Sequence, residues 1–174
     1  MSAVLAATSV NKKSKTKDNW TTPLQVKELL LQYTGGRPVY LDPCSNPDSI
    51  IEATIEWYGP HVGGTDGLVT PWPIPPGELC FVNNPYSATQ IWARKCNDEG
   101  QRTRGSIICL IPGDTSTAYF QRYLTQAASR CFWNTRMKFG GDVEGPATFP
   151  SLLGYWGPHI GKFHKVFGPY GWCR

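Results

Sequence analysis

The stretch FVNNPYSATQ, residues 81–90, is an apolar run that ends in two asparagines, a proline and a tyrosine. Asn-Pro pairs are typical of turns, because asparagine tolerates unusual backbone angles and proline fixes its own φ. A turn alone gives no reason for the tyrosine. An amide beside an aromatic ring matches a ligand that has hydrogen-bonding groups and a flat face, so this predicted turn is also a candidate binding site.

Strand-like and helix-like segments alternate around this stretch. Apolar runs typical of buried strands occupy residues 39–42, 61–66, 79–82 and 106–112. Helical patterns occupy residues 24–33, 49–58, a segment that starts at Ser87, and about 117–127. Capping-box patterns at Thr22 and Ser87 predict two helix starts, and Gly35-Gly36 predicts a helix end. Four prolines in residues 68–78 exclude a regular helix or a central strand there.

The C-terminal part of the chain has a different pattern. Residues 130–133, 151–156 and 162–167 are strand-like and are separated by glycine and proline, which predicts an antiparallel end to the sheet. The predicted fold class is therefore α/β, a mostly parallel sheet with helices on both faces and an antiparallel C-terminal β segment. Sheets of this kind bind ligands beyond the carboxyl ends of their strands, where Asp42 and Asn83 are expected.

Length and composition match one globular domain, with 174 residues, a mass of 19.4 kDa and 40% hydrophobic residues. No apolar run approaches the ~18 residues that a membrane span needs. Residues 1–10 lack the charged start of a secretory signal, so we expect a cytoplasmic protein. Six cysteines without a C-x-x-C pair indicate neither a zinc site nor a disulfide framework, and we expect no metal.

Basic residues gather in two runs, within residues 11–17 and within residues 94–104, and the formal net charge is +4. Such runs are typical of solvated surfaces and also of sites for polyanions. We expect residues 1–17 to form a flexible basic arm and residues 18–174 to form a single domain.

Polar residues at the predicted strand ends match a nucleoside. The carboxylates of Asp42 and Asp66 can accept hydrogen bonds from ribose hydroxyls, but no G-x-G-x-x-G is present, which disfavours a dinucleotide. The side-chain oxygen of Asn83 and the backbone carbonyl of Asn84 can together accept both N–H groups of an exocyclic amine. Tyr86 can stack on the face of the same base.

Five motifs carry a resemblance to a known family. They are DNWTTP (18–23), LDP (41–43), TDGL (65–68) followed by Trp72, NNPYS (83–87), and RMKF (136–139) followed by PATFPS (146–151). In this order they resemble the motifs of phage-type DNA N6-adenine methyltransferases, and they span most of the chain. The resemblance implies a Rossmann-like S-adenosylmethionine-dependent methyltransferase fold and methylation of adenine N6 in double-stranded DNA. It also implies that the protein is encoded by a phage or prophage and acts in a bacterial cell. Evasion of restriction is one biological role that the resemblance suggests for it.

The resemblance assigns roles to particular residues of this chain. The catalytic residues are Asn83, Asn84, Pro85 and Tyr86, around a base flipped out of the duplex. The residues expected to bind S-adenosylmethionine are Asp18, Trp20, Thr21, Asp42, Pro43, Cys44, Asp66, Gly67, Leu68 and Asn83. DNA contacts are expected from Arg94, Lys95, Arg136 and Lys138, and from the loop at residues 140–149.

The chain departs from the family pattern in two places. The family has Asn-Pro-Pro-Tyr where this chain has Asn84 in place of the first proline, although Pro85 still restricts that residue to extended angles. The proline-rich connector after Asp66 leaves no room for the third βα unit of larger methyltransferases, so we expect a trimmed fold without a separate target-recognition domain. A protein or RNA methyltransferase of the same fold, and a catalytically weak DNA-binding homologue, are the alternatives.

Overall fold

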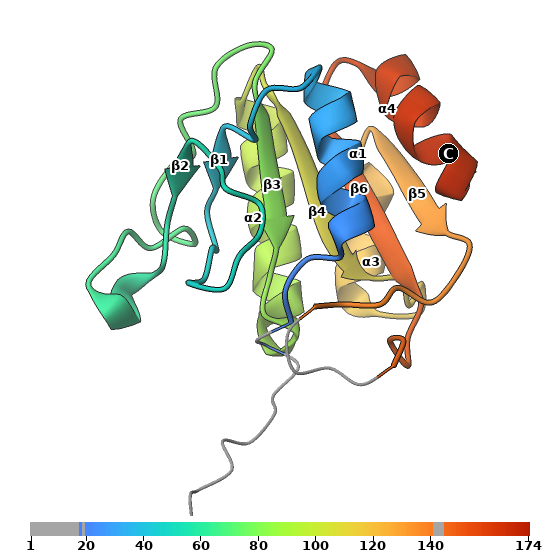
Figure 1. The fold of residues 1–174 in the computed structure, drawn as a ribbon, viewed down its shortest axis with the longest axis horizontal. Helices are drawn as coiled ribbons and strands as arrows, with labels where there is room; N and C mark the ends of the chain where they lie inside the picture. Colours follow the sequence, from blue (N-terminus) through green and yellow to red (C-terminus); the bar gives the residue numbers. More distant parts are fainter. Residues whose placement is uncertain (1–17, 19, 141–144) are drawn as a thin grey trace, which may run out of the picture.

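Seven strands form a single sheet in the part of the chain that the structure, a computed structural model, describes: residue 18, residues 20–140 and residues 145–174 (Figure 1). The strand order is β2-β1-β3-β4-β6-β5-β7. The strands are β1 (Leu41–Asp42), β2 (Ile55–Glu56), β3 (Leu79–Asn83), β4 (Ser106–Pro112), β5 (Ser129–Trp133), β6 (Ser151–Trp156) and β7 (Gly171–Cys173). From β2 to β4 the neighbours are parallel, whereas β6 is antiparallel to β4 and β5, and β7 is antiparallel to β5. The antiparallel C-terminal segment is confirmed.

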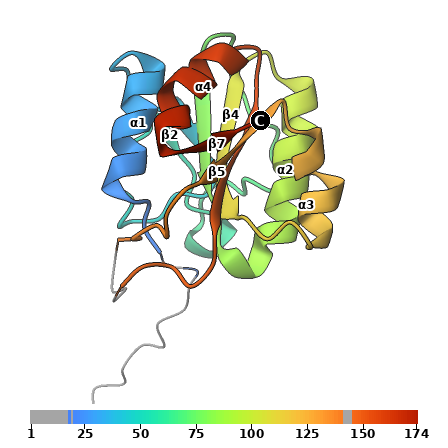
Figure 2. The same ribbon diagram turned by 90° about the vertical axis from the view of Figure 1, so that its right-hand side faces the viewer.

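Helices cover both faces of the sheet. They are α1 (Leu24–Thr34), α2 (Thr89–Arg102), α3 (Ala118–Arg122) and α4 (Ile160–Phe167). Figure 2 shows α1 and α4 on one face and α2 and α3 on the other. The two faces correspond to two apolar clusters, one around Leu30, Phe81 and Phe163 and the other around Trp92 and Cys109. The mixed α/β fold is thus confirmed.

Strand β3 lies in the centre of the sheet and leads directly to the NNPY stretch. Residues 79–82 are buried, with Phe81 packed on the α1 side and Cys80 and Val82 packed on the α2 side. A strand covered on both faces is apolar throughout, which explains the continuous run before Asn83. The first polar side chain of this segment therefore stands where the strand leaves the core.

The predicted helix at residues 49–58 is wrong. Its backbone pairs with the preceding strand instead: Ile55 donates to the carbonyl of Tyr40, and Trp57 donates to that of Asp42, both over 2.9 Å. Apolar and polar residues alternate from Ile51 to Tyr58, a period of two that is typical of a strand. The predicted strand at residues 61–66 is wrong as well, because a 3-10 turn (Pro60–Val62) and loop residues lie there.

The predicted strand at residues 162–167 is also wrong, since these residues belong to α4. Its buried residues Phe163, Val166 and Phe167 have the spacing of one helix face, which was the signal in the sequence. The last strand, β7, was not expected. The proline-rich connector is confirmed: residues 63–78, which are all described, contain neither helix nor strand.

The helices at Leu24–Thr34 and Thr89–Arg102 form as expected, but neither capping box does. Pro23 and Ala88 occupy the N-cap positions without a side-chain cap. The end of α1 at Gly35, in the left-handed conformation, is confirmed. No helix in the described residues is long and apolar enough to span a membrane.

Candidate active site at the ends of three strands

The candidate site lies at the edge where β1, β3 and β4 end, which is the lower edge of the sheet in Figure 1. Asp42 and Asn83 are the last residues of β1 and β3, and Pro112 is the last of β4. Strand β6 runs in the opposite direction and begins there, with Ser151 paired to Pro112. The parallel topology therefore brings together side chains from four separate segments.

Asn83 is held by its amide nitrogen. The Nδ2 group donates to the carbonyl of Trp20 over 3.1 Å and to the Oγ1 of Thr22 over 3.2 Å. A carbonyl can only accept, so these contacts fix which end of the amide points inward. The Oδ1 atom is left without a hydrogen-bond partner among the described residues. Thr22, predicted as a helix cap, uses its hydroxyl to orient this amide.

Asn84 turns its side chain into the protein. Its Nδ2 donates to the carbonyl of Pro85 over 2.9 Å and contacts the Oγ1 of Thr89 at 3.4 Å, and its Oδ1 accepts from the thiol of Cys109 at 3.8 Å. The residue in place of the family's proline is thus buried behind the turn.

Tyr86 stands in a group of aromatic rings. Its ring meets those of Trp20, Phe139 and Phe149 edge to face, with centroids 5.9, 5.8 and 5.1 Å away. Its hydroxyl is buried and has no hydrogen-bond partner in the described part of the chain, and this burial raises the pKa of Tyr86. A pocket of about 420 Å³ adjoins the ring and is lined by Asp18, Tyr86, Ser87, Pro112 and Phe149.

Asp18 ties the start of the domain to the turn. Its two carboxylate oxygens accept from the backbone N–H of Ser87 over 2.9 Å and from the Ser87 hydroxyl over 2.8 Å. Ser87, the other predicted helix cap, is therefore also used at the site. This contact fixes Asp18 at the turn, close to Trp20 and Thr22, which contact the Asn83 amide.

The turn after β1 contains a buried carboxyl group. Asp42 is 4% exposed, and its Oδ1 accepts from the backbone N–H of Cys44 over 3.1 Å. The pKa of Asp42 is raised to about 7, mainly by burial; the hydrogen bond from Cys44 acts to lower it, and the charge of Glu56 acts to raise it. Burial also raises the pKa of the Cys44 thiol, which stays protonated. The hydroxyl of Ser45 is buried without a partner among the described residues.

The Asp66–Leu68 loop packs against this turn. Asp66 follows a 3-10 turn and loop, so its expected place at a strand end is wrong. Its Oδ1 accepts from the backbone N–H of Leu68 over 2.8 Å. A Cβ on Gly67 would lie 2.0 Å from the carbonyl oxygen of Pro43, so only glycine permits this contact between the loops. The two segments expected to bind the cofactor are thus in direct contact.

Comparison with models of protein families matches residues 9–149 of the 174-residue chain to DNA N-6-adenine-methyltransferase (Dam). The chain belongs to the Dam family. No curated protein and no solved structure matches it. The resemblance inferred from the five motifs is therefore confirmed, and DNA is the substrate that membership of the Dam family implies. Among the described residues of this Dam family member, no group of three or more histidine, cysteine, aspartate or glutamate side chains could hold a metal ion.

The basic residues expected to contact DNA lie in two different surroundings. Arg136 and Lys138 are exposed and alternate with buried Met137 and Phe139, which places them next to the Tyr86 aromatic group. Arg94 is exposed on α2 and pairs with Asp98 at 3.5 Å. Lys95 is instead engaged inside the fold, as described below. The expected basic arm, residues 1–17, and part of the loop expected at residues 140–149 lie outside the described residues.

Several contributors to the site were missed in the sequence. Ser45, Ser87 and Pro112 were not assigned to it, and Thr22 was assigned to a helix cap. No spacing rule links Thr22 to Asn83, because their contact depends on how α1 enters the sheet. The alternation of exposed and buried residues in RMKF was a usable signal, since it predicts an extended segment with one apolar side.

Proposed function

We propose that this Dam family member transfers a methyl group from S-adenosylmethionine to the exocyclic N6 of adenine in double-stranded DNA, with the base flipped into a site formed by Asn83, Asn84, Pro85 and Tyr86. The observation that carries the proposal is the orientation of Asn83. Its amide nitrogen is occupied by Trp20 and Thr22, so that its oxygen remains as an acceptor at the strand end. An acceptor at that point is what an adenine amine requires.

The two acceptors would act on the nitrogen lone pair. In free adenine this pair is delocalised into the ring, which makes the amine a poor nucleophile. Hydrogen bonds from the two N–H groups to the Oδ1 of Asn83 and the backbone carbonyl of Asn84 favour a tetrahedral nitrogen, and they strengthen as positive charge develops on it. Both acceptors are neutral, so the proton leaves to water after the new N–C bond has formed.

The residues around the Asp42 turn match a nucleoside-bearing cofactor. S-adenosylmethionine, when bound, supplies an electrophilic methyl group. The hydroxyl of Ser45 and the second carboxylate oxygen of Asp66 have no hydrogen-bond partner among the described residues, and both lie at the same edge of the sheet as the buried Asp42 carboxyl. We assign the ribose hydroxyls to Asp66, because carboxylates accept such pairs of donors. Trp20, Thr21 and Leu68 would line the same region.

The aromatic group around Tyr86 would bind the flipped base. The Tyr86 ring borders the pocket of about 420 Å³, and stacking on a base is worth ~1–3 kcal/mol. Arg136 and Lys138, exposed beside this group, would contact DNA phosphates. Recognition by loops of one small domain favours limited sequence selectivity, and a phage enzyme that evades restriction in its bacterial host would need no more.

Transfer of labelled methyl groups to unmethylated DNA, followed by nucleoside analysis, tests the proposal. We expect N6-methyl-2′-deoxyadenosine as the product in the parent protein, loss of the product in Asn83→Ala, and full retention in Asn134→Ala, a matched change at an exposed asparagine. Label on cytosine, or equal yields from parent and Asn83→Ala, would refute the assignment of the site.

A further inference from the structure

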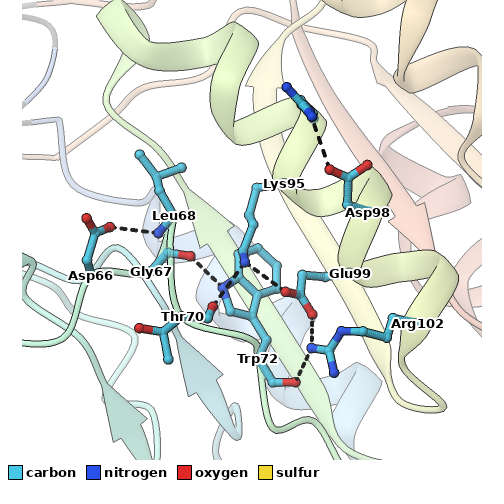
Figure 3. Close-up of polar contacts among 10 residues, drawn as sticks. Asp66, Gly67, Leu68, Thr70, Trp72, Lys95, Asp98, Glu99 and Arg102 are labelled. Carbon is cyan, nitrogen blue, oxygen red and sulfur yellow. Dashed lines mark hydrogen bonds and ion pairs between the residues drawn. The ribbon is translucent and has the colours of Figure 1, made fainter.

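Residues 66–72 contact helix α2 through a chain of buried and partly buried polar groups (Figure 3). The indole N–H of Trp72 donates to the carbonyl of Gly67 over 2.8 Å. The ammonium group of Lys95 donates to the carbonyl of Thr70 over 3.0 Å. The backbone N–H of Thr70 in turn donates to the carbonyl of Asp66 over 2.9 Å. The Asp66 loop is therefore held at two successive carbonyl groups, those of Asp66 and Gly67.

Glu99 joins the helix side of this chain. Its Oε1 lies 2.8 Å from the Lys95 ammonium, and its Oε2 pairs with Arg102, which also donates to the carbonyl of Trp72 over 3.2 Å. The side chains of Glu99 and Lys95 are only 5% and 14% exposed. A buried carboxylate between two cations is costly to disturb, because removal of one partner leaves an unpaired charge in the interior.

The Trp72 ring fixes the geometry of these contacts. It is buried, stacks on Trp92 with ring centroids 6.4 Å apart, and lies 5.7 Å from the Lys95 ammonium. An indole in this position cannot turn without losing its hydrogen bond to Gly67. The Gly67 backbone is in turn wedged against the carbonyl of Pro43. The position of Asp66 therefore depends on side chains of a helix that lies on one face of the sheet.

We propose that Lys95, Glu99 and Trp72 are positioning residues for the cofactor. These side chains hold the Asp66 loop, because residues 63–78 contain no helix or strand that could do so. The inference rests on the proposed function, in which Asp66 binds the ribose hydroxyls of the cofactor. It assigns Lys95 to the interior of the fold, where its ammonium group already has two partners, and not to DNA.

Two neighbouring acidic residues on α2 supply a matched test. Glu99→Gln weakens the hold on Lys95 and Arg102, whereas Asp98→Asn changes an acid that is 58% exposed and, within the described part of the chain, forms an ion pair with Arg94 alone. We expect Glu99→Gln to raise the Kd for S-adenosylmethionine, measured by calorimetry, by about tenfold. We expect Asp98→Asn to leave it unchanged. In turnover assays Glu99→Gln should raise the KM for the cofactor and leave kcat at saturation near that of the parent.

Lys95→Met distinguishes positioning from DNA binding, since it keeps the aliphatic stem over Trp72 and removes the charge. We expect weaker cofactor binding with the same DNA affinity and the same slope of log affinity against log salt. A Lys95 that contacted phosphate would give the reverse, a shallower slope and unchanged cofactor affinity, and would overturn the inference.

A double-mutant cycle separates positioning from a general loss of stability. If Glu99 acts through Asp66, Glu99→Gln should cost little further cofactor affinity in an Asp66→Asn background. Additive losses would overturn the inference while leaving the proposed function standing. A folded parent protein that binds no S-adenosylmethionine would instead overturn the proposed function, and this inference with it.

Discussion

The turn at Asn83–Tyr86 and the segment at residues 43–78 both contribute to the candidate site, but they are held in different ways. The turn follows a strand that is paired on both sides, and the buried side chain of Asn84 anchors it from behind. The 43–78 segment contains one two-residue strand and a 3-10 turn, and single side-chain contacts from α1 and α2, such as Lys27–Glu52 and Lys95–Thr70, attach it.

This difference predicts two separable kinds of variant. The proposed acceptors of the turn are placed by the sheet itself, so substitutions there should change the rate of methyl transfer and leave cofactor binding intact. The proposed cofactor groups of the 43–78 segment are placed by a few side chains, so substitutions there should change cofactor affinity first.

The largest effect is expected at Asn83. Asn83→Ala removes the proposed acceptor, and single-turnover methyl transfer should fall by about 10²–10³-fold, as for loss of one donor from an oxyanion hole. The cofactor Kd should stay within about twofold. Thr22→Val removes only one of the two contacts to Nδ2 and should cost less. A single-turnover rate equal to that of the parent would return the NNPY stretch to a simple turn.

Asp66 should show the opposite pattern. Asp66→Ala removes a carboxylate oxygen that has no partner among the described residues, and the hydrogen bonds proposed for it are worth ~1.5–3 kcal/mol. Calorimetry should therefore give a cofactor Kd about 10–100-fold higher, with DNA affinity unchanged. Unchanged cofactor affinity in a folded variant would show that Asp66 is not part of the site. It would also contradict the expectation that substitutions in the 43–78 segment change cofactor affinity first.

The same contrast explains what the sequence could predict. Leu79–Asn83 and Ser106–Pro112 are apolar runs bounded by turn residues, and a run of this kind is buried whatever its neighbours are. The 43–78 segment has no such signal. The helix predicted at residues 49–58 is wrong although the alternation within it is also typical of a strand, and what decides between the two is the long-range pairing with residues 39–42.

The sequence predicted where several of the candidate residues lie in the fold, but not which contacts they make. The motifs placed Asn83, Tyr86 and Asp42 at one edge of the sheet, where the structure has them. The two predicted capping boxes failed because Thr22 and Ser87 have other partners, the Asn83 amide and the Asp18 carboxylate. Hydroxyl groups near a helix start cap it only when no stronger acceptor or donor competes, and such competition is set by the tertiary fold.

Stability against pH should next distinguish the turn at Asn83–Tyr86 from Asp42, the strand residue that directly precedes the 43–78 segment. The pKa of Asp42 is about 7 in the folded protein, whereas that of an aspartate exposed to water, as in the unfolded chain, is 3.8. The folded state therefore binds the proton more tightly. Its contribution to stability is fully present below about pH 4 and is lost as the pH rises to about 7. Denaturation of the free protein should show a loss on the order of 4 kcal/mol from this group over that window.

Asp42→Asn should flatten this part of the pH profile, because the amide does not titrate. Parallel profiles for the parent and Asp42→Asn would show that the carboxyl has the same pKa in the folded and unfolded states. No such slope is expected from the turn. The pKa of a tyrosine already lies above the neutral range, and burial raises that of Tyr86 further.

A smaller effect is expected at the Tyr86 hydroxyl. Tyr86→Phe removes a buried group that has no partner among the described residues, so the free energy of unfolding should stay the same or rise by up to ~1 kcal/mol. Tyr119→Phe is the matched control, because its hydroxyl donates to the carbonyl of Pro112 over 2.8 Å and its loss should destabilise by ~1 kcal/mol. A Tyr86→Phe variant less stable than Tyr119→Phe would mean that the Tyr86 hydroxyl has a partner in solution.

The smallest change in rate is expected from Asn84→Pro, which restores the family's Asn-Pro-Pro-Tyr. The proposed acceptor at this position is the backbone carbonyl, which proline keeps, and Pro85 already restricts residue 84 to extended angles. Turnover should be retained or raised, within about threefold. Stability should fall by ~1 kcal/mol, because the contacts of the Asn84 side chain to Pro85, Thr89 and Cys109 are lost. Asn84→Ala separates the two effects, since it loses the same contacts without gaining the rigid ring. If Asn84→Pro folds but transfers methyl groups far more slowly than Asn84→Ala, the turn is adjusted to asparagine, and its geometry depends on a side chain as much as that of the 43–78 segment does.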